Sequence, residues 1–199
     1  QPAAAVVHKG NSRRFSTGLE AELAVGLTGA RWLTRADDLC DLLQHIGSRS
    51  TDSTGAADQS PDWVLKADLS HSARERIIGR GAELSPRDRS WVEARLQRVG
   101  GVVCEPWVDI VAEAGLQWEV PIAGDPQLVG VTPLLTDARG HYRGSAFADS
   151  GAERDWSEAL PFALIAARRI QAEGYFGPLG IDCCRYRDAG GGLRAGSRS

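Results

Sequence analysis

Between residues 116 and 147 the chain alternates short β-favouring runs with tight turns, and this pattern restricts the possible fold more than any other feature of the sequence. The runs cover residues 116–122, 127–135 and 142–147, and turns rich in Gly, Asp and Pro separate them at 123–126 and 137–140. Strands joined by such short turns form an antiparallel meander. We therefore expect an α+β protein with mainly antiparallel strands and with helices segregated from them.

Four segments carry apolar residues at helical spacing and are predicted as helices: 12–26, 35–46, 85–99 and 155–173. The apolar face of the first is expected at Phe15, Leu19 and Leu23. Ser85 and Pro86 are residue types that begin a helix, and the inner face of this third helix is expected at Val92, Leu96 and Val99. Gly47 and Gly174 are expected to end the second and fourth helices. Further strands are predicted at 63–67, 101–105 and 179–186, with a loop over 68–82.

The composition is that of an ordinary globular protein and excludes several function classes. Of the 199 residues, 42% are apolar and 25% are charged, and the net charge of −3 gives no basic field that would attract nucleic acid or an anionic membrane. No apolar run approaches the roughly 18–20 residues that span a bilayer. The four cysteines include no Cys-x-x-Cys pair, which disfavours a zinc site and favours buried, reduced thiols in a cytoplasmic protein. The sequence carries no signal for an oligomeric state.

One lysine stands just before a segment of small and basic residues. Lys66 lies in the apolar run 63–67, and the chain contains one other lysine, Lys9. The small and basic side chains that follow are Ser70, Ser72, Arg74 and Arg76. With Lys66, they would bring an ammonium, a guanidinium and free backbone N–H groups onto one polyphosphate. The alternative is an edge-strand lysine that deters aggregation. Neither a Walker motif nor Gly-x-Gly-x-x-Gly is present, which disfavours the parallel-sheet phosphate folds.

A second feature that suits a nucleotide follows about forty residues later. The strand predicted at 101–105 breaks off at Pro106, and the backbone amides freed at Trp107 and Val108 would hydrogen-bond to a purine ring. The alternative is an ordinary strand end whose Trp107 belongs to the core.

A third feature is a carboxylate inside an apolar strand. Asp182 lies between Ile181 and Cys183, where a buried carboxylate needs a metal ion or an arginine as its partner. Magnesium bridged to phosphate oxygens would meet this need, and Arg185 or Arg187 is the alternative partner.

Taken in order, Lys66, the segment 70–76, the run from Glu105 to Val108, and Asp182 resemble the ATP-grasp superfamily. In that superfamily a small-lobe lysine and a flexible small-residue loop hold the phosphates. A Glu-x-x-Val/Leu hinge binds adenine, and acidic residues on a later strand hold magnesium. The phrases Asn11-Ser-Arg-Arg-Phe-Ser16 and Gly174-Tyr-Phe-Gly-Pro-Leu-Gly-Ile-Asp182 look like a carboxylate–amine or carboxylate–thiol ligase-like branch of it. The resemblance covers residues 11–190.

The resemblance implies two mainly antiparallel α+β lobes with ATP and magnesium (Mg2+) as cofactors between them. The residues implied to contact ATP are Lys66, Ser70, Ser72, Arg74, Glu105, Trp107, Val108, Asp109 (or Glu113) and Arg13 (or Arg14). Lys66 and Arg74 would be the catalytic residues and Asp182 the magnesium ligand. The implied reaction activates a small-molecule carboxylate as an acyl phosphate, which an amine or thiol attacks with ADP as product. A non-catalytic nucleotide-binding module and a small-molecule kinase are the alternatives.

Two departures from the family pattern bear on the extent of the chain. Ala73 stands where the branch has glycine, and Arg194-Ala-Gly-Ser-Arg-Ser199 stands where a Glu-x-Asn-x-Arg motif is expected. Because the chain also lacks methionine, we expect a fragment of an ATP-grasp protein, incomplete at both ends. The expected segments are an N-terminal helical remnant of a preceding lobe (1–46), a polar linker (47–62), a small lobe (63–115), a partial large lobe (116–190) and a disordered tail (191–199).

Overall fold

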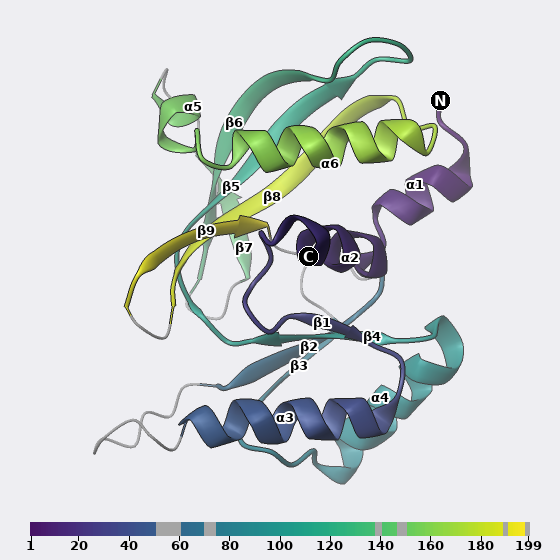
Figure 1. The fold of residues 1–199 in the computed structure, drawn as a ribbon, viewed down its shortest axis with the longest axis vertical. Helices are drawn as coiled ribbons and strands as arrows, with labels where there is room; N and C mark the ends of the chain where they lie inside the picture. The colour runs from purple at the N-terminus through teal and green to yellow at the C-terminus, as the bar shows by residue number, and fades with distance from the viewer. Residues whose placement is uncertain (51–60, 70–74, 138–140, 147–150, 189–190, 198–199) are drawn as a thin grey trace. The chain divides into compact units, whose positions relative to one another are not determined.

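The β-favouring runs pair into two separate antiparallel sheets in the computed structural model, which confirms the α+β class (Figure 1). The structure describes residues 1–50 (47–50 by their backbone alone), 61–69, 75–137, 141–146, 151–188 and 191–197. The chain divides into one unit of Leu27–Trp107 and one of Gln1–Gly26 with Val108–Ser199. This division differs from the predicted segments, because residues 1–26 group with the C-terminal part.

The unit Leu27–Trp107 is built on a four-stranded sheet in the order β1-β4-β2-β3. Its strands are β1 (Arg31–Leu33), β2 (Trp63–Ala67), β3 (Arg76–Gly79) and β4 (Val102–Pro106). Its helices, α3 (Ala36–Ser50) and α4 (Pro86–Val99), lie on the same side of this sheet (Figure 1). Leu39 and Leu43 of α3 and Val92 of α4 form one apolar cluster with Leu65 and Cys104 of the sheet. One face of the sheet is therefore the core of this unit.

The helix starts and strands of this unit follow the sequence closely, with three corrections. Ser85 caps α4, since its hydroxyl oxygen accepts a hydrogen bond from the Asp88 N–H at 3.2 Å. However, β3 lies inside the predicted loop 68–82, and α3 continues past Gly47 to Ser50. Val99, expected on the inner face of α4, is 48% exposed in the last turn of the helix.

The second unit contains a five-stranded antiparallel sheet in the order β7-β6-β5-β8-β9. Its strands are β5 (Asp109–Val120), β6 (Gln127–Thr136), β7 (Tyr142–Ser145), β8 (Gly177–Arg187) and β9 (Leu193–Ser197). Helix α6 (Leu160–Ala172) lies across β6, β5 and β8 (Figure 1). Phe162, Ala163 and Ala167 of α6 share an apolar cluster with Leu116 and Trp118 of β5. The alternating apolar residues of β5 thus form the sheet side of this core.

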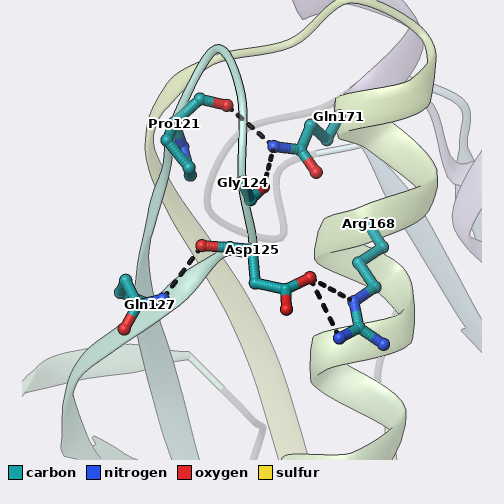
Figure 2. A network of polar contacts seen from close by, with 6 residues as sticks. All are labelled: Pro121, Gly124, Asp125, Gln127, Arg168 and Gln171. Atoms are coloured by element: carbon teal, nitrogen blue, oxygen red, sulfur yellow. Dashed lines mark hydrogen bonds and ion pairs between the residues drawn. The ribbon is translucent and has the colours of Figure 1, made fainter.

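The β5–β6 hairpin loop is attached to the C-terminal half of α6 by side-chain hydrogen bonds (Figure 2). The Gln171 amide donates to the carbonyl oxygens of Pro121 and Gly124 at 2.8 and 2.9 Å. Two nitrogens of the Arg168 guanidinium lie 3.1 and 3.0 Å from the same carboxylate oxygen of Asp125. A four-residue turn that the sequence predicted is therefore fixed by a helix more than forty residues away.

Four predictions about this unit require correction. The predicted helix 155–173 is divided into the short α5 (Ala152–Asp155) and α6. β5 begins at Asp109, so the predicted boundary between residues 115 and 116 falls inside one strand. The predicted disordered tail contains β9, which pairs with β8. Finally, the buried residues of α2 (Arg13–Leu23) are Thr17 and Glu20, and of the predicted apolar face Leu23 packs against the apolar cluster as a partly buried residue.

The N-terminal helices are joined to this second unit by backbone as well as side chains. Here α1 (Ala4–Gly10) precedes α2, and the chain leaves α2 through Ala24 and Val25. The Val25 carbonyl oxygen accepts a hydrogen bond from the Ser197 N–H at 3.0 Å. Residues from the two ends of the described chain therefore complete one sheet edge.

Candidate functional site

Lys66 lies on the face of its sheet that points away from α3 and α4. Neighbouring side chains of a strand alternate between faces. Since Trp63 and Leu65 pack in the cluster with the helices, Val64 and Lys66 point to the opposite face. Lys66 is nevertheless only 6% exposed. A buried ammonium requires a partner of opposite charge.

The partner that the structure gives Lys66 is Glu105. The Lys66 Nζ lies 2.7 Å from each of the two Glu105 carboxylate oxygens, and Glu105 is 3% exposed. The two residues come from neighbouring strands, because Val64 of β2 pairs with Glu105 of β4 in the antiparallel register. The sequence singled out both residues but assigned them separate roles. It missed their contact, which depends on strand register across 39 residues.

The pKa of the thiol next to Glu105 shows how strongly the helix side of this sheet disfavours charge. Cys104 faces the helices and has no exposed surface. Burial, and secondarily the charge of Glu105, raises the pKa of the Cys104 thiol to about 12. The helix side of β4 therefore disfavours charge. On the opposite face of the sheet, the buried charges of Lys66 and Glu105 offset each other.

The strand end at Trp107 differs from the predicted adenine hinge in one respect. The Trp107 N–H donates to the Asp62 carbonyl oxygen at 2.9 Å, so this amide is not available to a purine. Asp62 also accepts, through its side chain, a hydrogen bond from the Gly81 N–H at 2.7 Å. Trp107 itself is half-buried, as is Val108, which begins the other unit. The Trp107 backbone contact is thus part of the small sheet's own hydrogen bonding.

Asp109 and Asp182 both lie on the surface of the second unit. Asp109 is exposed at the start of β5, with its carboxylate 3.6 Å from the Arg187 Nε. Asp182 of β8 is also exposed, which corrects the prediction that its strand buries it. Arg185, one of its expected partners, binds the Glu158 carboxylate at 2.7 Å and stacks on Trp156.

Polar side chains and glycines surround Asp182 on its face of the sheet. Gly115 of β5 pairs with Asp182 and is followed two residues later by Gln117. A Cβ atom on Gly115 would lie 2.9 Å from the Gln117 amide nitrogen and 3.6 Å from an Asp182 oxygen. Glu113, on the same face of β5, is 9% exposed. Oxygen donors thus collect on this face, although the described residues contain no group of three or more His, Cys, Asp or Glu side chains placed to hold a metal ion.

The remaining predicted site residues fall into two groups. Arg13 is the first residue of α2 and is half-buried, whereas Arg14 beside it is exposed. Ser70, Ser72 and Arg74 lie outside the described residues.

None of the helices in the described part of the chain is long and apolar enough to cross a membrane.

Comparison with known proteins identifies the fold. No protein-family profile matches the chain, and a search of curated protein sequences gives no match. Among solved structures, the biotin carboxylase domain of Hydrogenobacter thermophilus 2-oxoglutarate carboxylase, in complex with MgADP, ADP and bicarbonate, aligns with a TM-score of 0.68 at 15% identity. The alignment covers 99% of this chain and 41% of that one.

Two further structures support the same assignment. N5-carboxyaminoimidazole ribonucleotide synthetase from Thermus thermophilus aligns with a TM-score of 0.63 at 17% identity, over the whole of this chain and 46% of that one. The ATP-grasp ligase PsnB, complexed with a minimal precursor, aligns with a TM-score of 0.53 at 12% identity, over 98% of this chain and 54% of that one. The chain thus spans about half the length of the structures that it matches, and its fold is that of the ATP-grasp superfamily.

Proposed function

We propose that this chain is the ATP-binding portion of an ATP-grasp ligase that forms ADP. The observation that carries the proposal is the buried Lys66 ammonium, held by a carboxylate at 2.7 Å on the face of a small antiparallel sheet that points away from α3 and α4. A buried lysine of this kind is a point charge suited to phosphate oxygens. The fold supports the assignment, since a biotin carboxylase domain of the same fold holds ADP and its magnesium salt.

In the proposed reaction a small-molecule carboxylate attacks the γ-phosphate of ATP, giving an acyl phosphate and ADP. An amine or thiol then displaces phosphate from the acyl group. Lys66 and Arg74 would bind phosphate oxygens, with Ser70 and Ser72 beside them. Glu105, Trp107 and Val108 would lie along the adenine, Asp109 or Glu113 at the ribose, and Arg13 near the α-phosphate. Such catalysis is mainly positioning and electrostatic stabilisation of charge that develops on the phosphoryl group.

Asp182 is the proposed magnesium ligand. Its carboxylate is exposed beside Gln117 and near the buried Glu113, so oxygen donors of the type that magnesium prefers are present on one sheet face. When bound, the ion would neutralise phosphate charge. The contribution of this chain is to hold the carboxylates at fixed positions on β5 and β8.

Titration calorimetry with a non-hydrolysable ATP analogue tests the proposal, and the chain's two lysines provide a matched control. Lys66→Ala is expected to weaken binding more than tenfold, or about 1.4 kcal/mol. Lys9→Ala is expected to change affinity by less than about twofold, since the Lys9–Glu173 pair is exposed on both sides. Unchanged affinity in folded Lys66→Ala protein, as checked by circular dichroism, would refute the phosphate role of Lys66.

A second titration addresses the metal. Magnesium is expected to strengthen binding of the analogue to the wild-type protein, and Asp182→Asn to abolish this strengthening. Asp125→Asn is the control, because Asp125 is an exposed carboxylate held by Arg168 on the β5–β6 hairpin. If both variants respond to magnesium like the wild-type protein, Asp182 is not the ligand.

Product analysis separates ligase chemistry from the alternatives. ADP release that requires both a carboxylate and an amine or thiol supports the ligase. A stable phosphorylated product would identify a kinase instead. Binding of the analogue without ADP formation in any substrate mixture would identify a non-catalytic nucleotide-binding module.

A further inference from the structure

The Lys66 ammonium shares the proposed phosphate site with a carboxylate. Each oxygen of Glu105 lies 2.7 Å from the Lys66 nitrogen, and both residues are buried. A triphosphate carries several negative charges, so a site that brings more than one cation to it binds it more tightly. A cation placed beside Lys66 would therefore strengthen phosphate binding.

The strand register places one cation directly beside Lys66. β2 and β3 are antiparallel, and Lys66 pairs with Arg76 as the last pair of the ladder. Side chains directly opposite each other on neighbouring strands lie on the same sheet face, with their Cβ atoms about 4.5–5.5 Å apart. Arg76 therefore lies on the same sheet face as Lys66, the one that points away from α3 and α4, and it is half-buried there.

The residue before Arg76 supports this orientation independently. The Glu75 carboxylate lies 3.5 Å from a nitrogen of Arg95 on α4, and the Arg95 guanidinium stacks on Trp91 with 4.3 Å between it and the ring centre. Glu75 thus faces the helix side of the sheet. Because neighbouring residues of an extended strand alternate, Arg76 must face away from the helices.

The backbone also fixes this end of the hairpin. The Ala67 N–H donates to the Glu75 carbonyl oxygen at 3.0 Å, which continues the hydrogen bonding of the ladder one step beyond the Lys66–Arg76 pair. The position of Arg76 is therefore fixed by the backbone pairing of β3 with β2 and by the contact of the preceding residue, Glu75, with Arg95. Preorganised cations bind an anion without having to be ordered first.

We propose that Arg76 is a phosphate-binding residue of this site and acts together with Lys66, an inference that rests on the proposed ATP-binding function. Arginine suits the task because its guanidinium stays charged at any physiological pH and binds two phosphate oxygens at once. The sequence had favoured Arg74 as the guanidinium partner of Lys66, whereas the register brings Arg76 beside it. Lys66 and Arg76 would thus bring an ammonium and a guanidinium to the same phosphates.

The test compares three probes: the ATP analogue, inorganic tripolyphosphate and adenosine. Arg76→Ala is expected to weaken the analogue and tripolyphosphate about tenfold, while adenosine binding stays unchanged. Arg76→Lys keeps the charge but loses the two-pronged geometry, so a loss of about threefold is expected. Arg80→Ala is the matched control, since it removes the same charge from an exposed residue just after β3 and is expected to alter no affinity.

Each result decides between the two proposals. If Arg76→Ala binds the analogue like the Arg80→Ala control, the Arg76 inference is wrong and the ATP site survives. Equal losses for adenosine and the analogue would show that Arg76 only supports the fold, which also overturns the inference. If the wild-type protein binds tripolyphosphate but not the analogue, the ATP proposal fails, and the Arg76 variants still test the anion site. If it binds neither, both proposals are overturned.

Discussion

Lys66 and Glu105 occupy positions where neither could remain charged alone. Both are more than nine-tenths buried, and the free energy of transferring a lone charge from water to such a position exceeds that of any single hydrogen bond. The small sheet thus buries one ammonium and one carboxylate side by side. Its effect on stability can be separated from its effect on binding.

Lys66→Ala is expected to destabilise the protein by about 3–5 kcal/mol, because it leaves the Glu105 carboxylate buried without its ammonium partner. The double variant Lys66→Met with Glu105→Leu is expected to recover most of this loss, since apolar side chains of similar size suit the same interior. Urea denaturation measures both. If the double variant is stable yet fails to bind the ATP analogue, the pair serves ligand binding rather than folding; if it is as unstable as Lys66→Ala, charge burial is not the cause.

The buried thiols predict a loss of stability at alkaline pH. Burial raises the pKa of Cys104 to about 12 and raises that of Cys183 as well, where the nearby Cys184, Asp182 and Glu20 add to the effect. The unfolded thiols ionise near the ordinary value of 9.0, whereas the folded thiols keep their protons. Folding stability should therefore be level below pH 8 and decline above pH 9, by about 1.4 kcal/mol per pH unit for each such thiol.

Denaturation midpoints between pH 7 and pH 11 test this expectation. Cys104→Ala removes one of the two thiols, so the decline above pH 9 should become shallower even though the variant is less stable at neutral pH. An unaltered slope in this variant would show that Cys104 ionises in the folded protein as it does in the unfolded chain.

At the scale of elements, the β5–β6 hairpin illustrates how a helix can fix a turn. Gln171→Ala removes the donor that serves the Pro121 and Gly124 carbonyl oxygens, and Arg168→Ala removes an exposed ion pair to Asp125 (Figure 2). We expect Gln171→Ala to destabilise the protein by about 1–2 kcal/mol and Arg168→Ala by less than about 1 kcal/mol. Urea denaturation of the two variants measures the difference, and the opposite ranking would show that the ion pair dominates.

The elements that the sequence predicted are those whose own residues determine them. The apolar spacing of α6, the Ser85 cap of α4 and the alternating residues of β5 each carry a local signal, and each is confirmed. β3 and β9 are short and carry no such signal. They are strands because β2 and β8 present a free edge with which they pair. Pairing of this kind is a tertiary contact, which propensity in a single segment does not encode.

The same distinction applies to the candidate site. Lys66 could be identified because a lysine in an apolar strand is unusual in a chain with only two lysines. Its contact with Glu105 and its position beside Arg76 depend on the register of three strands, which periodicity alone does not determine. Asp182 was expected to be buried because its neighbours are apolar, yet it is exposed, as are Pro178 and Gly180 before it on the same side of β8.

At the scale of the whole molecule, the two units have separate apolar clusters and should respond separately to core substitutions. Leu65 and Leu116 are both fully buried, one in each cluster. Each change to alanine is expected to destabilise its own unit by about 3–5 kcal/mol. Differential scanning calorimetry should then resolve two transitions, of which Leu65→Ala lowers one and Leu116→Ala the other. A single transition that both variants shift equally would show that the units unfold together.

The Val25–Ser197 hydrogen bond has a consequence for the order in which the protein can form during synthesis. The unit Leu27–Trp107 is continuous in sequence, so all of its strands and helices are synthesised before residue 108 and the rest of the chain. Residues 1–26 emerge first but belong to a unit whose last strand ends at Ser197. The N-terminal helices therefore cannot complete their packing until some 170 further residues have been translated, because the sheet edge to which they are joined is β9.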